Sequence, residues 1–235
     1  MYKDVIGILG GMGSYATLNL FKRLLTAFPA EKEWERPRMI IDNNCTMPSR
    51  VLAILDNEKY GVLINQMVQS VKHLIDFGAT KIIFACNTSH YFLPEILKEI
   101  PTLKERFISL IDCCVEEIIR CNEKKLFLLA TEGTISARIF HNAIKNRDIS
   151  LSVPIGESYL LQRKIIEAVK QNNITEDKLH QFIELIKESE GSAVILGCTE
   201  FSVIYDNYKK IFKDLDIKIY DPIECVINKL TKECN

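Results

Sequence analysis

The chain has 235 residues, a formal net charge of −1 and 26% charged residues, so it lacks the basic excess that binding to a nucleic-acid backbone requires. No apolar run approaches the roughly 20 residues that span a bilayer. We therefore expect a cytoplasmic protein with no nucleic-acid and no membrane partner. Hydrophobic residues make up 47% of the sequence, enough for a core that needs no metal or disulfide.

The apolar elements of the first half are short and alternate with amphipathic segments, which is typical of an α/β protein. The glycines at 10, 11 and 13 permit a tight turn between the first strand and the first helix. In chain order we predict a strand at 5–9, a helix at 14–27 capped by Ser14, a strand at 38–43, a loop at 43–50, a helix at 59–77, a strand ending at Cys86, a helix at 89–99 and a strand at 107–111 ending at Asp112.

The second half repeats this alternation from Lys125 onwards. A helix at 113–122 precedes this point. From Lys125 we predict a strand at 126–130, a helix at 135–146, a strand at 151–155, and helices at 157–171 and 176–190. They are followed by a strand from 193 that ends near Cys198 and leads into a helix, a strand at 217–220 ending at Asp221 and a last helix at 222–233.

Three strand-end motifs recur in the same order in the two halves, which indicates an internal repeat. Residues 5–14 align with 125–134, Cys86 aligns with Cys198, and Asp112 aligns with Asp221. The repeat predicts two pseudo-symmetric βα domains with mainly parallel sheets and a cleft between them. We assign residues 1–112 plus 222–235 to the N-terminal domain and residues 113–221 to the C-terminal domain.

The eight cysteines show no CxxC spacing, and the four histidines are far apart, so no metal site is expected. Most of the cysteines are expected to be small core residues. Cys86 and Cys198 differ, because each ends a buried strand where parallel α/β sheets carry their ligand chemistry.

Two thiols that face one cleft can invert a carbon stereocentre by general acid–base catalysis. One thiolate removes the α-proton from one face, and the other group, as a thiol, protonates the opposite face. The substrate carboxylate must then be stabilised as it gains enediolate character, and hydroxyls, amides and helix N-termini at the strand ends are suitable donors. Such donors are present at Asn87, Thr88, Thr131, Thr134 and Thr199.

Several of these motifs resemble the aspartate/glutamate racemase family within the cofactor-independent Asp/Glu/hydantoin racemase superfamily. The resemblance lies in Ala85-Cys-Asn-Thr-Ser-His90, Leu196-Gly-Cys-Thr-Glu200, Gly7-Ile-Leu-Gly-Gly-Met-Gly13, Ala130-Thr-Glu-Gly-Thr134 and Pro48-Ser-Arg50, and it covers essentially the whole chain. It implies two flavodoxin-like domains with the active site between them, a homodimer, and racemisation of aspartate, glutamate or both without pyridoxal phosphate or any other cofactor.

The resemblance also implies the roles of individual residues. Cys86 and Cys198 are the two acid–base residues, and the presence of both favours racemisation in both directions. Arg50 contacts the acidic side chain or pairs with the catalytic groups, and Lys170, with Lys164 as its rival, is the site lysine. The substrate-binding set is Met12, Arg50, Asn87, Thr88, Ser89, Thr131, Thr134, Lys170, Thr199 and Glu200.

Other readings stay open at the level of sequence. Glu200 can orient a substrate ammonium or a thiol, or it can simply complement a helix dipole. A related cysteine-dependent isomerase or decarboxylase, of the maleate isomerase or hydantoin racemase kind, is one alternative, and a non-catalytic two-lobed binding protein is another. Aspartate and glutamate differ by one methylene, worth only about 1–3 kcal/mol of discrimination, so the motifs do not choose between them.

Overall fold

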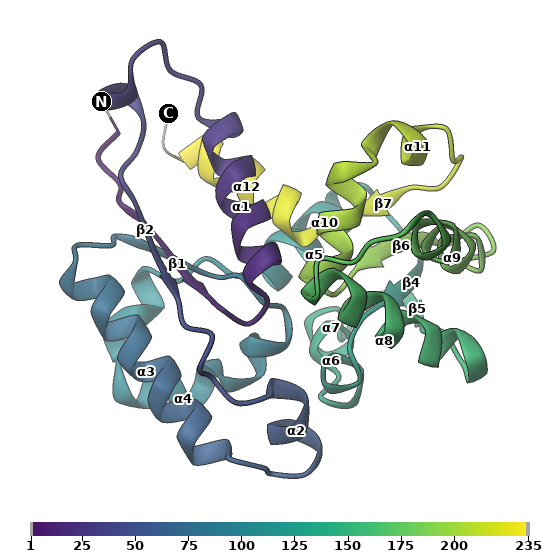
Figure 1. Cartoon of the computed structure of the whole chain (residues 1–235), viewed down its shortest axis with the longest axis horizontal. Helices are drawn as coiled ribbons and strands as arrows, with labels where there is room; N and C mark the ends of the chain where they lie inside the picture. Colours follow the sequence, from purple (N-terminus) through teal and green to yellow (C-terminus); the bar gives the residue numbers. More distant parts are fainter. Residues whose placement is uncertain (1, 234–235) are drawn as a thin grey trace.

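Each half of the chain is built on a parallel sheet, as the computed structural model of residues 2–233 shows (Figure 1). The first sheet has the order β2-β1-β3, from β1 (Ile6–Gly10), β2 (Met39–Asn43) and β3 (Lys81–Phe84). The second has the order β5-β4-β6-β7, from β4 (Lys125–Leu129), β5 (Ser150–Ser152), β6 (Ala193–Leu196) and β7 (Ile219–Tyr220).

The two sheets share one topology, which confirms the α/β fold with parallel sheets. In each half the first strand lies at the centre, between the second and third strands of that half. Phe107 makes a parallel bridge to Ile82, at the position that β7 occupies in the second sheet. The internal repeat seen in the sequence is therefore a repeat of strand order.

Helices connect the strands on both sides of the sheets. The first half contains α1 (Ser14–Ala27), α2 (Arg50–Leu55), α3 (Tyr60–Asp76), α4 (Leu93–Glu99) and α5 (Leu110–Arg120), with short 3₁₀ turns η1 (Glu33–Glu35), η2 (Thr88–Phe92) and η3 (Pro101–Glu105). The second half contains α6 (Glu132–Ser136), α7 (Ile139–Ala143), α8 (Gly156–Lys170), α9 (Glu176–Lys187), α10 (Thr199–Asn207), α11 (Lys209–Lys213) and α12 (Pro222–Glu233). Among residues 2–233, none of these helices is both long and apolar enough to cross a membrane.

The last helix returns to the first sheet. Val226 and Leu230 of α12 are buried in one cluster with Ile6 and Ile8 of β1 and Leu20 of α1. This packing agrees with the assignment of α12 to the N-terminal domain. The boundaries 1–112 and 113–221 stay a prediction. Residues 234–235 lie outside the described part of the chain.

Helix α1 lies between the two halves in Figure 1. Its residues Leu20 and Leu24 pack with the first sheet, whereas Ala16 packs with Phe201 and the core of the second half. Because one rigid helix contacts both cores, it fixes the two sheets relative to each other.

The predicted strand at 107–111 is wrong beyond its first residue. Only Phe107 pairs with the sheet, because the side chain of Ser109 accepts a hydrogen bond from the backbone N–H of Asp112 and so caps α5. Asp112 therefore lies exposed in the first turn of a helix rather than at a strand end.

Two helix starts also differ from the expectation. Gly13, not Ser14, is the N-cap of α1, and the Ser14 hydroxyl instead contacts Cys45 and accepts from Asn43. The predicted loop at 43–50 ends in α2, which was not foreseen, because the Ser49 side chain accepts from the backbone N–H of Leu52.

The predicted helix at 135–146 is two short helices, α6 and α7. They are separated at Arg138, which adopts a left-handed backbone conformation with φ of 53° and cannot continue an α-helix.

Candidate active site

Cys86 and Cys198 line the same small cavity, of about 40 Å³, between the two halves. They lie just beyond the carboxyl ends of β3 and β6, and both are buried, with 8% and 5% of their surface exposed. The cavity is lined by Met12, Ser49, Arg50, Val51, Cys86, Asn87 and Thr88 from the first half and by Thr131, Lys170, Cys198, Thr199 and Glu200 from the second.

The residue after each cysteine reaches across to the other half. The Thr199 hydroxyl donates to the carbonyl of Ala85 at 3.1 Å, and the Asn87 amide approaches the carbonyl of Leu196 at 3.5 Å. These contacts are reciprocal, since each starts beside one cysteine and ends on the strand that leads to the other. They hold the ends of β3 and β6 together at the cavity.

Three threonine hydroxyls form a second link between the halves. Thr88 contacts Thr131 at 3.0 Å and Thr134 at 2.9 Å, and Thr131 and Thr134 lie 3.1 Å apart. Thr131 is the N-cap of α6, so its side chain also accepts from the backbone N–H of Thr134. Thr88 and Thr131 line the cavity, whereas Thr134 is fully buried behind them.

The guanidinium of Arg50 is anchored by main-chain carbonyls. Arg50 donates to the carbonyl of Pro48 at 3.0 Å and to that of Met12 at 2.6 Å, while its Nε is buried without a partner. The turn that presents Met12 depends on Gly11, whose φ is +81° and where a Cβ would lie 2.2 Å from the backbone of Asn44.

Glu200 lies directly against the second thiol. The Sγ of Cys198 donates to the Oε2 of Glu200 at 2.9 Å, and Oε1 is buried without a hydrogen-bond partner. Burial, followed by the negative charge of Glu200 and its hydrogen bond, raises the pKa of the Cys198 thiol well above its ordinary value.

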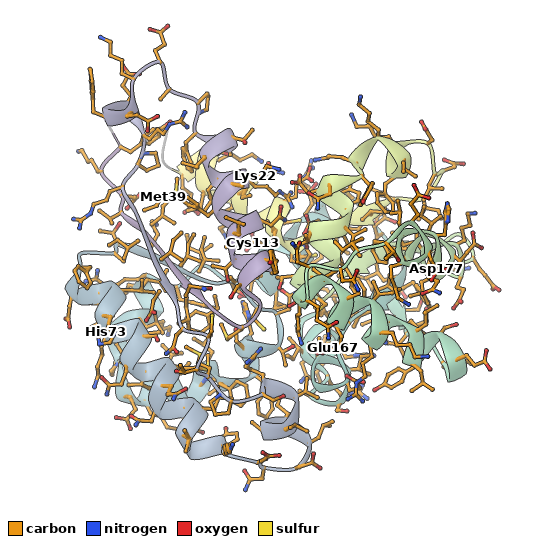
Figure 2. The ribbon with its side chains drawn as sticks, in the orientation of Figure 1. Lys22, Met39, His73, Cys113, Glu167 and Asp177 are labelled. Atoms are coloured by element: carbon orange, nitrogen blue, oxygen red, sulfur yellow. The ribbon has the colours of Figure 1, made fainter. Side chains whose placement is uncertain are left out.

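Lys170, in the last turn of α8, places a positive charge near Cys198 and Glu200. Its Nζ donates to Glu167 at 3.1 Å (Glu167 is labelled in Figure 2). Burial opposes the charge of Lys170, but the charges of Glu200, Cys198 and Glu167 outweigh it and raise the pKa of the lysine. Lys164 lines a separate surface groove between α8 and α9.

Ser89 and His90 hold the main chain of Cys86 and do not line the cavity. The Ser89 hydroxyl donates to the carbonyl of Cys86 at 2.6 Å, and His90 Nδ1 donates to the same carbonyl at 3.0 Å. His90 is the Nδ1–H tautomer, because its Nε2 accepts from the backbone N–H of Leu110 at 3.1 Å. Burial lowers the pKa of His90 to about 4, so the ring is neutral at neutral pH.

Three polar atoms around the cavity are buried without partners: the Nε of Arg50, the Oδ1 of Asn87 and the Oε1 of Glu200. Buried polar atoms are nearly always paired, so their concentration here indicates that a polar ligand completes the site. Arg50 supplies a donor and the Asn87 amide an acceptor to such a ligand, whereas the Oε1 of Glu200 faces Gly13, where a Cβ would lie 2.2 Å from it.

Ten of the twelve residues expected from the sequence line the cavity, and Ser89 and Thr134 support it from behind. Ser49 and Val51 also line it and were missed. The sequence feature that could have indicated them is Ser49 as a helix N-cap. It places residues 49–51 at the start of a short helix that faces the cavity. Within residues 2–233, no three histidine, cysteine, aspartate or glutamate side chains are grouped so that they could hold a metal ion.

Two parallel-sheet halves with a thiol from each at one cavity define a two-lobed α/β protein with a paired-cysteine site. The model of the Asp/Glu/Hydantoin racemase family matches residues 9–230, and the chain belongs to that family.

Solved structures of racemases share the fold over nearly the full chain. The aspartate racemase of Picrophilus torridus is 26% identical, with a TM-score of 0.82 over 98% of this chain and 94% of its own. A glutamate racemase from Francisella tularensis, solved in complex with D-glutamate, is 22% identical, with a TM-score of 0.68 over 98% of this chain and 80% of its own.

Among curated relatives, the glutamate racemase of Persephonella marina is 25% identical over 170 residues, or 68% of this chain. The matched region spans 61% of that relative's length.

Proposed function

We propose that the protein is a cofactor-independent amino-acid racemase that interconverts the L- and D-forms of aspartate, glutamate or both. The observation that carries the proposal is the pair Cys86 and Cys198, which come from opposite halves of the repeat and line one cavity. Family membership over residues 9–230 supports the same reaction.

In the proposed reaction the protons balance within the site. A thiolate takes the α-proton and becomes a thiol, while the other cysteine gives its proton to the opposite face of the carbanion and becomes a thiolate. The reverse reaction uses the same two groups in exchanged roles. The free protein must then return one proton from the first sulfur to the second before the next turnover in the same direction.

The substrate's carboxylates would meet donors from both halves. We assign the side-chain carboxylate to Arg50, whose buried Nε lacks a partner, and the α-carboxylate to Asn87, Thr88, Thr131 and Thr199. These groups lie at the first turns of η2, α6 and α10, where backbone N–H groups also favour an anion.

The remaining residues of the expected set play supporting roles in the proposal. Met12 lines the cavity and anchors Arg50 through its carbonyl, while Lys170 and Glu200 set the charge beside Cys198. Ser89 and Thr134 act indirectly, through the Cys86 carbonyl and the Thr88 hydroxyl.

Aspartate is the acid that we expect to be preferred. The cavity of about 40 Å³ holds only a few water molecules, so it must widen for either acid, and the shorter acid requires less widening. The likeness to an aspartate racemase at 26% identity points the same way. Comparing kcat/KM for the two acids tests this preference.

The test of the function is deuterium exchange at Cα in D₂O, followed by NMR, together with polarimetry on each enantiomer. We expect Cys86→Ala and Cys198→Ala each to abolish racemisation. Cys45→Ala, which removes an exposed thiol outside the cavity lining, is the matched control and keeps its activity. Retained racemisation in both site variants contradicts the proposal.

The buried Arg50 Nε favours a substrate with a side-chain carboxylate over a neutral hydantoin ring. A substrate panel separates racemisation from maleate isomerisation or decarboxylation, because only racemisation changes optical rotation while leaving both mass and connectivity unchanged.

We also propose a homodimer that works in the cytoplasm. The proposal rests on the family and, for the location, on the seven described cysteines, all of which are free thiols. Light scattering coupled to size exclusion measures the assembly: a mass of twice 27.0 kDa supports the dimer.

A further inference from the structure

We propose that Glu200 is a positioning residue that keeps the proton on Cys198, so that Cys198 is the thiol donor in the free protein. The inference rests on the proposed racemase and adds that its two thiols are not equivalent. It assigns Glu200 to the second thiol and not to the substrate.

The geometry around Glu200 makes this role specific. The residue lies in the first turn of α10, two positions after Cys198, and only 3% of its surface is exposed. Its Oε2 accepts from the Cys198 thiol at 2.9 Å. The Cys86 thiol has no hydrogen-bond partner among residues 2–233, so the two thiols of the repeat differ in their surroundings.

Gly13 keeps the carboxylate in that place. A Cβ at Gly13 would lie 2.2 Å from the Oε1 of Glu200, so any larger residue would displace the carboxylate. The φ of Gly13 is −176°, an extended conformation open to every residue. A side chain at position 13 would therefore take the space that Glu200 occupies, and it would not strain the backbone.

The charges that face Cys198 come from several elements. Glu200 on α10 is the nearest, Lys170 on α8 lies opposite with its partner Glu167, and Arg50 on α2 and Cys86 after β3 share the cavity. Burial and Glu200 raise the pKa of the Cys198 thiol and Lys170 opposes them, with the net direction upward. A thiolate at Cys198 would lie beside a carboxylate, which favours return of the proton after turnover.

This asymmetry has a kinetic consequence. The two enantiomers have equal free energies, so kcat/KM must be the same in both directions. A difference between the two thiols can therefore change kcat for one enantiomer relative to the other only if KM changes by the same factor. The enantiomer whose product is protonated by Cys198 finds that sulfur already carrying its proton.

The test is site-resolved alkylation by iodoacetamide across pH, read by peptide mass spectrometry on the full-length protein without substrate. In the native protein we expect Cys86 to react at least tenfold faster than Cys198 at pH 7. In Glu200→Gln the Cys198 rate should rise about tenfold, and its midpoint should move to lower pH. Glu184→Gln, which removes an exposed carboxylate on α9, is the matched control and should leave both rates unchanged.

Gly13→Ala provides a second variant that retains Glu200 but displaces its carboxylate. We expect it to raise the Cys198 rate in the same direction, and it keeps the test decisive if Glu200→Gln fails to fold. Equal native rates for the two thiols, or a Cys198 rate unchanged in the folded variants, overturns the proposal.

Because alkylation needs no turnover, this result is independent of the cysteine-variant test of the racemase itself. Where racemisation is present, convergence of the two kcat values in Glu200→Gln is the matching kinetic result. If racemisation is absent, the alkylation rates still decide whether Glu200 holds the proton.

Discussion

At the scale of single residues, the site distinguishes side chains that the sequence treats alike. Lys170 and Lys164 lie on the same helix, α8, but only Lys170 lines the cavity and faces Cys198 and Glu200. Lys164 lines a groove against α9. An offset of six positions is not a whole number of helical turns, so the two side chains point in different directions.

We therefore expect Lys170→Met to lower kcat/KM by about 10- to 100-fold, because it removes the positive charge that lies beside Cys198 and Glu200 at a cavity proposed to bind an anion. Lys164→Met is the matched control and should change kcat/KM by less than twofold. Steady-state polarimetry on both enantiomers measures the effect, and equal losses in the two variants would refute the assignment.

At the scale of elements, η2 connects the first thiol to the fold. The turn begins at Thr88, four residues after the end of β3 at Phe84, and Ser89 and His90 both bond to the carbonyl of Cys86. His90 also accepts from the first residue of α5, so its ring ties the strand end to the next helix. The His90 ring is therefore a structural link and does not line the cavity.

The buried ring makes stability depend on pH. The folded pKa of His90, about 4, lies below its unfolded value of 6.5, so its contribution is fully present above pH 6.5 and is lost as pH falls through 4. We expect the native protein to lose about 3 kcal/mol more unfolding free energy than His90→Gln between pH 7 and pH 4. Urea titrations at several pH values measure this, and parallel pH curves would contradict it.

At the scale of the whole molecule, Arg23 on α1 joins the halves through a buried ion pair. It pairs with Asp221, which also accepts from the Ser202 hydroxyl at 2.7 Å and from the backbone N–H of Ile223 at 3.0 Å. Asp221 thus holds α10 and the start of α12 as well as α1. Asp221 therefore joins three helices, whereas Asp112, its partner in the repeat, lies exposed in the first turn of α5.

Removing Arg23 leaves the carboxylate of Asp221 buried and uncompensated. We expect Arg23→Met to lower the unfolding free energy by about 3–5 kcal/mol. Lys22→Met, which changes the exposed neighbour labelled in Figure 2, should cost less than about 0.5 kcal/mol. Asp221→Asn in the Arg23→Met background should recover part of the loss, and purely additive effects would contradict the pairing.

The sequence by itself determined the repeat, the α/β class and the positions of both cysteines. These features follow from local patterns: short apolar runs, glycine turns and polar residues directly after strands. The local rules failed where a single side chain decided the outcome, as at Ser109, which caps α5 and converts a predicted strand into a helix.

Only the tertiary structure decided which residues meet at the cavity and which support it from behind. Lys170 rather than Lys164 reaches the site, Ser89 and Thr134 lie behind it, and Glu200 contacts a thiol. These outcomes depend on how α1, α8 and α10 pack across the two halves. Contacts between residues more than 100 positions apart, such as Thr199 with Ala85, leave no periodic signal in the chain.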